Sequence, residues 1–252
     1  GRLLADGAGP AMTPPPALRL TGQHRIDARP LFDVDMTLAA GAWTCLLGPS
    51  GVGKSTVLRL LLGLETGGAF DGTITASDGQ PLAGRISYMA QSDLLLPWLT
   101  VIDNIMIGDR LRGTTPDRDR ASAMLARVGL QDHAHKKPAA LSGGMRQRAA
   151  LARTLLEDRA VVFLDEPFSA LDAGTRAAMQ ELAAELLHGR TVLLVTHDPA
   201  EAARLADHIL ILSATGVQSW PVPALRAPRP VTAPEVWACQ SALLSHLRGV
   251  PA

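Results

Sequence analysis

Short, mostly apolar runs of strand length recur along this chain, and each ends at a turn or at a polar residue. The clearest are residues 44–47, 85–89, 160–164 and 191–196. Nearly continuous apolar runs of this length are typical of strands that are buried on both faces, as in a parallel sheet covered by helices. The pattern therefore predicts an α/β fold with a mainly parallel sheet.

A helical pattern lies between residues 92 and 141. Four apolar residues are spaced i, i+3, i+4 and i+7, as on one face of a helix: Ala121, Met124, Leu125 and Val128. We expect Thr115 to be the N-cap of this helix, Pro116 its first residue and Gly129 its end.

The pattern changes again beyond Leu212. Prolines at positions 221, 223, 228, 230 and 234 oppose regular structure. Residues 235–247 then read as one short amphipathic helix. We expect this tail to pack back on the core, and leave open a role in dimer contacts.

Composition limits the classes of partner. The chain has 252 residues, 24 Lys and Arg against 24 Asp and Glu, and 47% hydrophobic residues, which is enough for one α/β domain with a helical insertion. A net charge of zero predicts no nucleic acid partner. No apolar run reaches the ~20 residues of a membrane span and no signal peptide is evident, so we expect a cytosolic chain. Two cysteines without a C-x-x-C pattern fit a reducing compartment.

Residues 1–11 have little pattern. We expect Met12 to be the natural start and the residues before it to be vector-derived or a misassigned start.

A glycine-rich loop joins the run 44–47 to a helical segment. It has the form G-x-x-x-x-G-K-S, in which glycines turn backbone N–H groups toward a phosphate at a helix N-terminus. The predicted nucleotide-binding residues are Gly48, Pro49, Ser50, Gly51, Val52, Gly53, Lys54, Ser55 and Thr56. Lys54 is expected to reach the β- and γ-phosphates, and the Ser55 hydroxyl to complete a Mg²⁺ shell.

Two adjacent carboxylates end the apolar run 160–164. Ligands bind open parallel sheets at the carboxyl ends of the strands, where Asp165 and Glu166 are placed. We expect Asp165 to hold Mg²⁺, directly or through water, and Glu166 to polarise the water that attacks the γ-phosphate.

These motifs, together with Leu141–Arg148, resemble the Walker A, signature and Walker B motifs of an ATP-binding cassette (ABC) ATPase. Gln91 resembles the Q-loop glutamine, residues 169–172 the D-loop and His197 the switch histidine. The resemblance spans residues 30 to 212. It implies a P-loop NTPase fold with an antiparallel β subdomain and a small α-helical signature subdomain.

The resemblance also implies three segments and a mechanism shared by two chains. Residues 1–17 would be a flexible or vector-derived segment, 18–212 the ATPase domain with its helical subdomain at about 92–150, and 213–252 a proline-rich tail. Two such domains pair head to tail, and each ATP lies between the phosphate loop of one and Ser142, Gly143 and Gly144 of the other.

The implied roles of the remaining motif residues follow from the same resemblance. His197 would contact the γ-phosphate and hold the water together with Glu166, and Asp172 would connect the two sites. Gln91 would link the γ-phosphate to a membrane subunit and contribute to the Mg²⁺ shell. Catalysis is thus assigned to Glu166, His197, Gln91 and Lys54, and the metal shell to Ser55, Gln91 and Asp165.

Two positions depart from the family pattern. The place at which an aromatic ring usually stacks on adenine falls near Ile26, with only His24 as a nearby ring. We therefore expect weak selection of the base. Met145 replaces a glutamine that often follows the signature glycines, which we interpret as variation within the family.

The apolar segment 94–101 after Gln91 is either core packing between subdomains or an exposed groove for a partner helix. Its sequence, followed by Asp103 and Asn104, resembles the importer branch that serves nitrate, sulfonate, taurine and thiamine-precursor pyrimidines. That resemblance implies a permease, a binding protein acting indirectly, and a position on the cytoplasmic face of the membrane.

Within the branch, the compact region from Gly84 to Gln91 and the short tail favour a thiamine-precursor (hydroxymethylpyrimidine) system. The alternatives are nitrate, sulfonate or taurine uptake, and a soluble ATPase of cluster-assembly type without a permease. A small-molecule P-loop kinase is excluded by the signature residues.

Overall fold

The computed structural model describes residues 14–27 and 29–249. Residues 1–11, predicted to be vector-derived or a misassigned start, lie outside this range, whereas residues 14–17 of the predicted amino-terminal segment lie inside it. The strands are β1 (Leu18–Ile26), β2 (Arg29–Leu38), β3 (Trp43–Leu47), β4 (Ala69–Ala76), β5 (Ile86–Met89), β6 (Val161–Asp165), β7 (Thr191–Val195), β8 (His208–Ser213) and β9 (Gly216–Trp220). The helices are α1 (Lys54–Leu61), α2 (Val101–Ile105), α3 (Ile107–Leu111), α4 (Arg118–Arg127), α5 (Gly143–Leu156), α6 (Ala173–Leu186), α7 (Pro199–Leu205) and α8 (Pro234–Gly249), with short 3-10 turns at Gln131–His133 and Pro138–Ala140.

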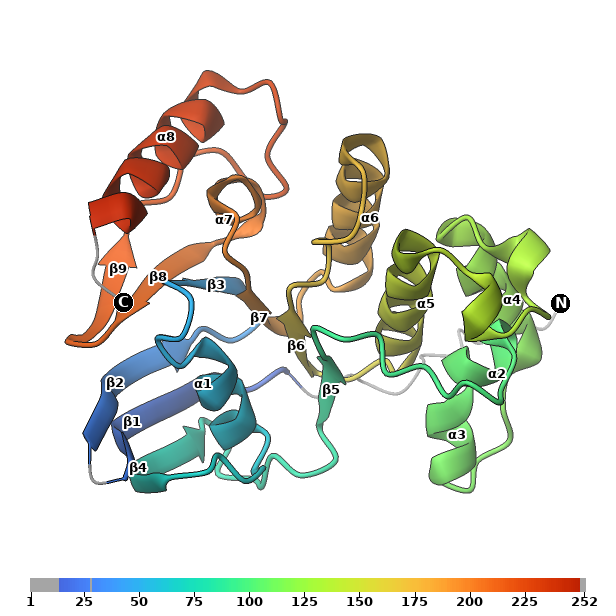
Figure 1. The fold of residues 1–252 in the computed structure, drawn as a ribbon, viewed down its shortest axis with the longest axis horizontal. Helices are drawn as coiled ribbons and strands as arrows, with labels where there is room; N and C mark the ends of the chain where they lie inside the picture. Colours follow the sequence, from blue (N-terminus) through green and yellow to red (C-terminus); the bar gives the residue numbers. More distant parts are fainter. Residues whose placement is uncertain (1–13, 28, 250–252) are drawn as a thin grey trace, which may run out of the picture.

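A six-stranded sheet in the order β5-β6-β7-β3-β8-β9 forms the centre of the molecule (Figure 1). Neighbouring strands are parallel except at β9, which pairs antiparallel with β8. Every residue of β3, β6 and β7 is buried. The parallel sheet predicted from the apolar runs is therefore confirmed. Strand β9 was not predicted, and the sheet continues past Leu212 to Trp220.

A second sheet of three antiparallel strands, β2-β1-β4, lies on one side of the first (Figure 1). Along β2, buried and exposed positions alternate, because only one face of this sheet is covered. Its buried side chains pack with α1 and with one face of the central sheet around Phe32, Leu58 and Phe163. This packing fixes the helix that follows the phosphate loop.

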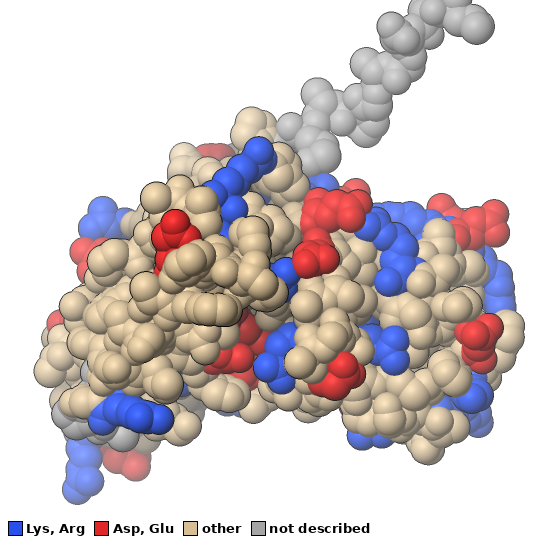
Figure 2. Space-filling view, turned by 90° about the horizontal axis from the view of Figure 1, so that it is seen from above, with Lys and Arg blue, Asp and Glu red and all other residues tan. Residues whose placement is uncertain are grey.

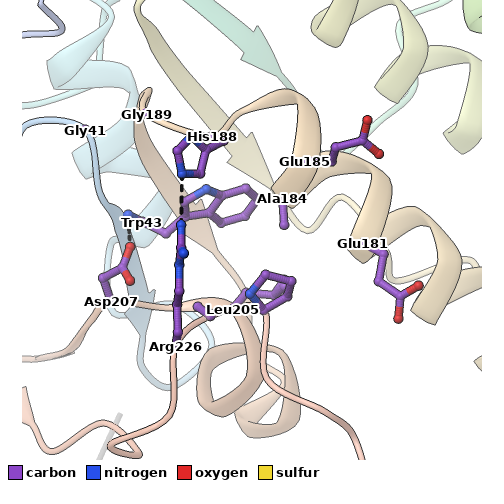
Figure 3. A pocket seen from close by; sticks show the side chains of 12 residues that line it. Gly41, Trp43, Glu181, Ala184, Glu185, His188, Gly189, Leu205, Asp207 and Arg226 are labelled. Atoms are coloured by element: carbon purple, nitrogen blue, oxygen red, sulfur yellow. Dashed lines mark hydrogen bonds between the residues drawn. The ribbon is translucent and has the colours of Figure 1, made fainter.

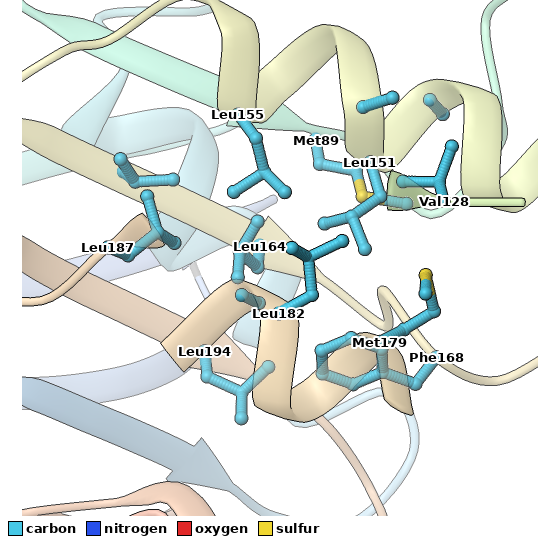
Figure 4. Packing of buried hydrophobic residues seen from close by; sticks show 14 of the residues in the cluster. Met89, Val128, Leu151, Leu155, Leu164, Phe168, Met179, Leu182, Leu187 and Leu194 are labelled. Atoms are coloured by element: carbon cyan, nitrogen blue, oxygen red, sulfur yellow. The ribbon is translucent and has the colours of Figure 1, made fainter. Parts of the chain in front are cut away.

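Helices α5 and α6 lie on the other side of the central sheet, and α2–α4 lie beyond α5 (Figure 1). Their apolar side chains meet the sheet in one continuous core that includes Leu151, Leu164, Phe168 and Leu182 (Figure 4). This core holds the ends of β5, β6 and β7 in fixed relative positions. The motif residues at and after these strand ends are therefore held in fixed relative positions too.

Helix α4 begins later than predicted. Asp117 is the N-cap and accepts a hydrogen bond from the backbone N–H of Arg120 at 2.9 Å, whereas Thr115 and Pro116 precede the helix. Asp117 rather than Thr115 is the N-cap because its carboxylate reaches the free N–H groups of the first turn. The predicted buried face is confirmed, and Gly129 ends the helix with a φ of 66°.

The carboxyl-terminal tail packs on the core through α8, as expected, with Val236 and Leu243 buried against it. At the other end, the carbonyl of Pro16 accepts a hydrogen bond from Thr191 and the N–H of Ala17 donates to Ser77. Contacts with the core thus begin before Leu18.

Charges of both signs are interspersed over the face shown in Figure 2. Within residues 14–27 and 29–249, no helix combines the length and the apolar character that crossing a membrane requires.

Candidate functional site

The phosphate loop connects β3 to α1, as its sequence predicts. Gly53 has a φ of 105°, and a Cβ atom there would lie 2.6 Å from Cδ1 of Phe32, so only glycine fits. Gly53 is also the N-cap of α1 and offers no side-chain oxygen to the first turn. The free N–H groups and the helix dipole therefore remain available to an anion.

Lys54 is the first residue of α1, and its side chain turns back toward this loop. Its Nζ donates hydrogen bonds to the carbonyl oxygens of Gly48 at 2.7 Å and Pro49 at 2.8 Å. Burial lowers the pKa of Lys54, while the nearby charges of Glu166 and Asp165 oppose that shift. The ammonium is thus held between the loop and the two carboxylates.

Asp165 ends β6 and Glu166 follows it; both are almost fully buried. Burial and, next, the charge of Glu166 raise the pKa of Asp165 to about 6, against the effects of Lys54 and of a hydrogen bond from Tyr88. Burial and Asp165 together raise the pKa of Tyr88 to about 12. The cause is concentrated negative charge that water cannot reach, which a bound cation would relieve.

Glu166 joins the strand ends of β6 and β7. Its backbone N–H donates to the carbonyl of Val195 at 2.9 Å, and Nδ1 of His197 lies 2.7 Å from its Oε1. Glu166 has a φ of 50°, a left-handed conformation that costs a non-glycine residue free energy. The neighbouring strands hold this turn, so that the carboxylate and the imidazole are oriented together.

Gln91 lies in the exposed loop just after β5. Met89 of β5 pairs with Leu164 of β6, so the loops that carry Gln91 and Asp165 leave the same edge of the sheet side by side. The structure thus brings the phosphate loop, Gln91, Asp165, Glu166 and His197 to the carboxyl ends of adjacent strands.

Ser142 is the N-cap of α5, and its Oγ accepts the N–H of Met145 at 3.3 Å. A Cβ atom on Gly144 would lie 3.2 Å from the carbonyl of Ala170, so the helix start packs closely against the D-loop. Among the described residues, no hydrogen bond joins Ser142, Gly143 or Gly144 to the phosphate loop.

Gln147 is a residue whose importance was missed from the sequence. Its side chain is buried, donates from Nε2 to the carbonyl of Glu166 at 2.9 Å and accepts from the N–H of Ala170 at 2.7 Å. The available signal was a glutamine within the apolar face of a helix, where a polar side chain needs partners.

Two further arginines connect α5 to the loop after Gln91. Nε of Arg146 donates to Asp93 at 3.0 Å, and Arg153 donates to the carbonyls of Asp93 and Leu94 at 2.8 and 2.9 Å. The signature helix and residues 93–94 are therefore held as one unit.

Asp172 is the N-cap of α6 and accepts the N–H of Thr175 at 3.0 Å. This hydrogen bond lowers the pKa of Asp172. One turn later, Arg176 donates to the carbonyl of Leu171 and lies 3.6 Å from Asp198, just after His197. Residues 171–172 are thus connected to the loop that carries His197 within one chain.

The one ring predicted near the base position, that of His24, offers no open face. His24 is fully buried, stacks on Phe32 and bonds to Thr66 through Nε2 at 2.8 Å. Ile26 is 38% exposed and lines a cavity of about 510 Å³ with residues 27 and 29–31.

The segment 94–101 is divided between core and surface. Leu95 is buried, whereas Leu94 is 59% and Trp98 67% exposed. The side chain of Asn104 bonds to both the N–H and the carbonyl of Leu96, which holds the turn around Pro97. Core packing thus accounts for Leu95 but not for Trp98.

The fold and the loop geometry define a P-loop protein that binds nucleoside triphosphates, and comparisons with known proteins give the family. A family model described as ABC transporter matches residues 31–169. An uncharacterized ABC transporter ATP-binding protein of Haemophilus influenzae is 43% identical over 87% of this chain and 93% of its own length. The aliphatic sulfonates import ATP-binding protein SsuB 1 of Rhodococcus jostii is 46% identical over 78% of each chain, and SsuB of Escherichia coli K12 is 44% identical over 79% of this chain and 77% of its own.

A solved bacterial Atm1-family ABC exporter with ATP bound superposes with a TM-score of 0.71 at 24% identity, over 84% of this chain and 40% of the exporter. The chain belongs to the ABC transporter family, as an ATP-binding subunit that hydrolyses ATP to drive transport. The resemblance inferred from the motifs is therefore confirmed.

Proposed function

We propose that this chain is the ATPase subunit of an importer for aliphatic sulfonates. Two observations support the proposal. The SsuB relatives named above are sulfonate import proteins, and Trp98 is exposed on the segment after Gln91. No relative reported above bears the name of a thiamine-precursor system, so that narrower preference stays without support.

The pairing of Glu166 with His197 is the observation that carries the hydrolytic mechanism. With Nδ1 of His197 at 2.7 Å from Oε1, one carboxylate oxygen is held and the other is left to accept a proton from water. The imidazole then presents Nε2 to the γ-phosphate. Lys54 and the N–H groups of the phosphate loop bind the β- and γ-phosphates of ATP.

The site also fits Mg²⁺. Burial and the charge of the adjacent Glu166 raise the pKa of Asp165, as expected where a cation is needed to balance charge. Asp165, the Ser55 hydroxyl and the side-chain oxygen of Gln91 are hard oxygen donors of the kind this ion prefers. When bound, Mg²⁺ would neutralise charge on the β- and γ-phosphates.

A second copy of the chain completes the site in this proposal. Ser142 and Gly143 begin a 14-residue helix, and their free N–H groups suit a γ-phosphate bound to the partner's loop. ATP then joins the two copies, and hydrolysis releases them. Asp172 and Arg176 connect this contact to the switch loop that carries His197.

Coupling to the membrane is assigned to the exposed residues after Gln91. Leu94 and Trp98 are the exposed apolar side chains of this segment, whose backbone is held by Asn104 and Arg153, and they suit contact with a short helix of a permease. The chain then works at the cytoplasmic face of the membrane, with a binding protein acting through the permease.

Uptake measurements in the source organism test the cargo. Cells whose chromosomal copy carries Glu166→Gln should lose uptake of labelled ethanesulfonate and keep uptake of nitrate and of hydroxymethylpyrimidine. Loss of hydroxymethylpyrimidine uptake alone would show that hydroxymethylpyrimidine, and not a sulfonate, is the transported compound. Normal uptake of all three, with ATPase activity of the purified variant abolished, would favour the soluble alternative.

A further inference from the structure

A cavity of about 690 Å³ lies at the amino end of β3, whereas the phosphate loop follows the carboxyl end of that strand (Figure 3). Its wall comes from the start of β3, the second half of α6, the end of α7 and residues 226–228 of the tail. Volumes of about 300–1,000 Å³ are usual for sites of small organic molecules. The function proposed above uses none of these residues.

One side of the cavity is apolar. The indole of Trp43 is 7% exposed and lies beside Arg226 and His188 in Figure 3. Leu205, Ala184 and Pro228 continue the same surface. A hydrocarbon chain or ring placed here would bury apolar area on both partners.

The three carboxylates that line the cavity already have donors. Glu181 accepts from Arg204 at 2.6 Å, Glu185 from Arg127 at 2.7 Å, and Asp207 from the backbone N–H of Trp43 at 2.9 Å. The charges of Glu181 and Glu185 are therefore offset by arginines, whereas Asp207 is hydrogen-bonded to a neutral amide.

Arg226 differs from these carboxylates because its partner is uncharged. Its Nη2 donates to Nε2 of His188 at 3.2 Å; since guanidinium has no acceptor, that imidazole nitrogen carries no proton. Within the part of the chain that the structure describes, Arg226 forms no ion pair with a carboxylate. A guanidinium beside an apolar wall can bind a planar or tetrahedral oxyanion with two N–H groups.

We propose that this cavity binds a small organic anion whose carboxylate or sulfonate group lies on Arg226 and whose apolar body lies along Trp43 and Leu205. The anion need not be the cargo of the transporter, and the site does not depend on the function proposed above.

Calorimetric titration of the full chain with hexane-1-sulfonate tests this site. The titration is repeated with saturating ADP and Mg²⁺, because the phosphate loop also attracts anions. We expect binding to persist with nucleotide present and to weaken about tenfold or more in Arg226→Gln, as for loss of a charge-assisted hydrogen bond. Arg25→Gln, an exposed arginine on β1, is the matched control and should bind as the parent does.

Two further measurements distinguish binding at the anion site from non-specific hydrophobic binding. Hexan-1-ol, which has the same apolar body without the charge, should bind at least tenfold more weakly than the sulfonate. Ala184→Phe, which fills the cavity without altering charge, should abolish sulfonate binding. Unchanged affinity in Arg226→Gln, equal binding of the alcohol, or displacement by nucleotide would each overturn the proposal.

Discussion

The side chain of Gln147 donates a hydrogen bond to the backbone carbonyl of Glu166 at 2.9 Å, so α5 holds the turn that carries the proposed general base of the same chain. The two residues are 19 positions apart. Signature and hydrolytic site are therefore joined inside each subunit as well as across the proposed dimer.

Replacing Gln147 by Ala should leave the Ala170 N–H without its partner and remove one of the donors to the Glu166 carbonyl, to which Ser169 still donates. We expect the free energy of unfolding to fall by about 1–3 kcal/mol and kcat to fall more than ATP affinity. Gln147→Glu is the informative control, because it can still accept from Ala170 but cannot donate to Glu166. Denaturant unfolding and steady-state ATPase assays measure both effects; parent-like kcat in both variants would contradict the positioning role.

Glu166→Gln should keep ATP binding and remove the group that accepts the proton from water. We expect hydrolysis to fall by about 10²-fold or more, and nucleotide-joined dimers to accumulate. Single-turnover hydrolysis and size-exclusion chromatography with ATP give the two readouts. Hydrolysis within about threefold of the parent rate would show that Glu166 is not the group that accepts the proton from water.

Nucleotide selectivity should be weak, because Ile26 has no ring and His24 is buried. We expect ATP and GTP to bind with affinities within about tenfold of each other, since stacking contributes ~1–3 kcal/mol. Ile26→Tyr should raise ATP affinity about tenfold, and Ile26→Leu should not. A strong preference of the parent for ATP in calorimetry would show that another group stacks on the base.

Trp98→Ala should leave the thermal midpoint and the basal ATPase rate of the isolated chain unchanged, because the side chain is 67% exposed. Uptake by the assembled transporter should be lost, since an exposed aromatic is the usual anchor of such an interface. Leu95→Ala is the matched control within the same segment: Leu95 is buried, so its truncation should cost about 2–5 kcal/mol of stability. A lowered thermal midpoint of Trp98→Ala with intact uptake would show that Trp98 packs in the core and does not dock the permease.

Glu201 should make the protein less stable as pH rises. Burial raises its pKa to about 7, with Thr196 opposing, Asp198 and Glu166 adding to the rise, and Arg176 opposing. The unfolded chain releases this proton near pH 4.5 and the folded chain near 7, so stability falls between these values by about 3 kcal/mol. Glu201→Gln should remove that dependence in urea titrations from pH 5 to 8, whereas exposed Glu185→Gln should retain it. An identical slope in Glu201→Gln and the parent would refute the assignment.

The sequence predicted those parts of the site that depend on local geometry. A glycine such as Gly53, needed for its backbone conformation, and a carboxylate directly after a buried strand can be recognised because neighbours in sequence determine their positions. The cap of α4 was misplaced because Thr115 and Asp117 are both good caps, and only the path of the chain selects between them. Contacts between distant residues, such as Gln147 with Glu166, depend on packing that no local pattern shows. Strand β9 was missed because it is short and half exposed.

The anchoring of α5 has a mechanical consequence. At 14 residues the helix is about 21 Å long. Arg146 and Arg153 tie two of its turns to Asp93 and Leu94, a few residues from Trp98. A displacement of residues 93–98 at the membrane would therefore move α5 as a rigid body. The first residues of α5 are the ones that meet the other subunit's nucleotide in the proposed dimer, so the same displacement would move them relative to that nucleotide.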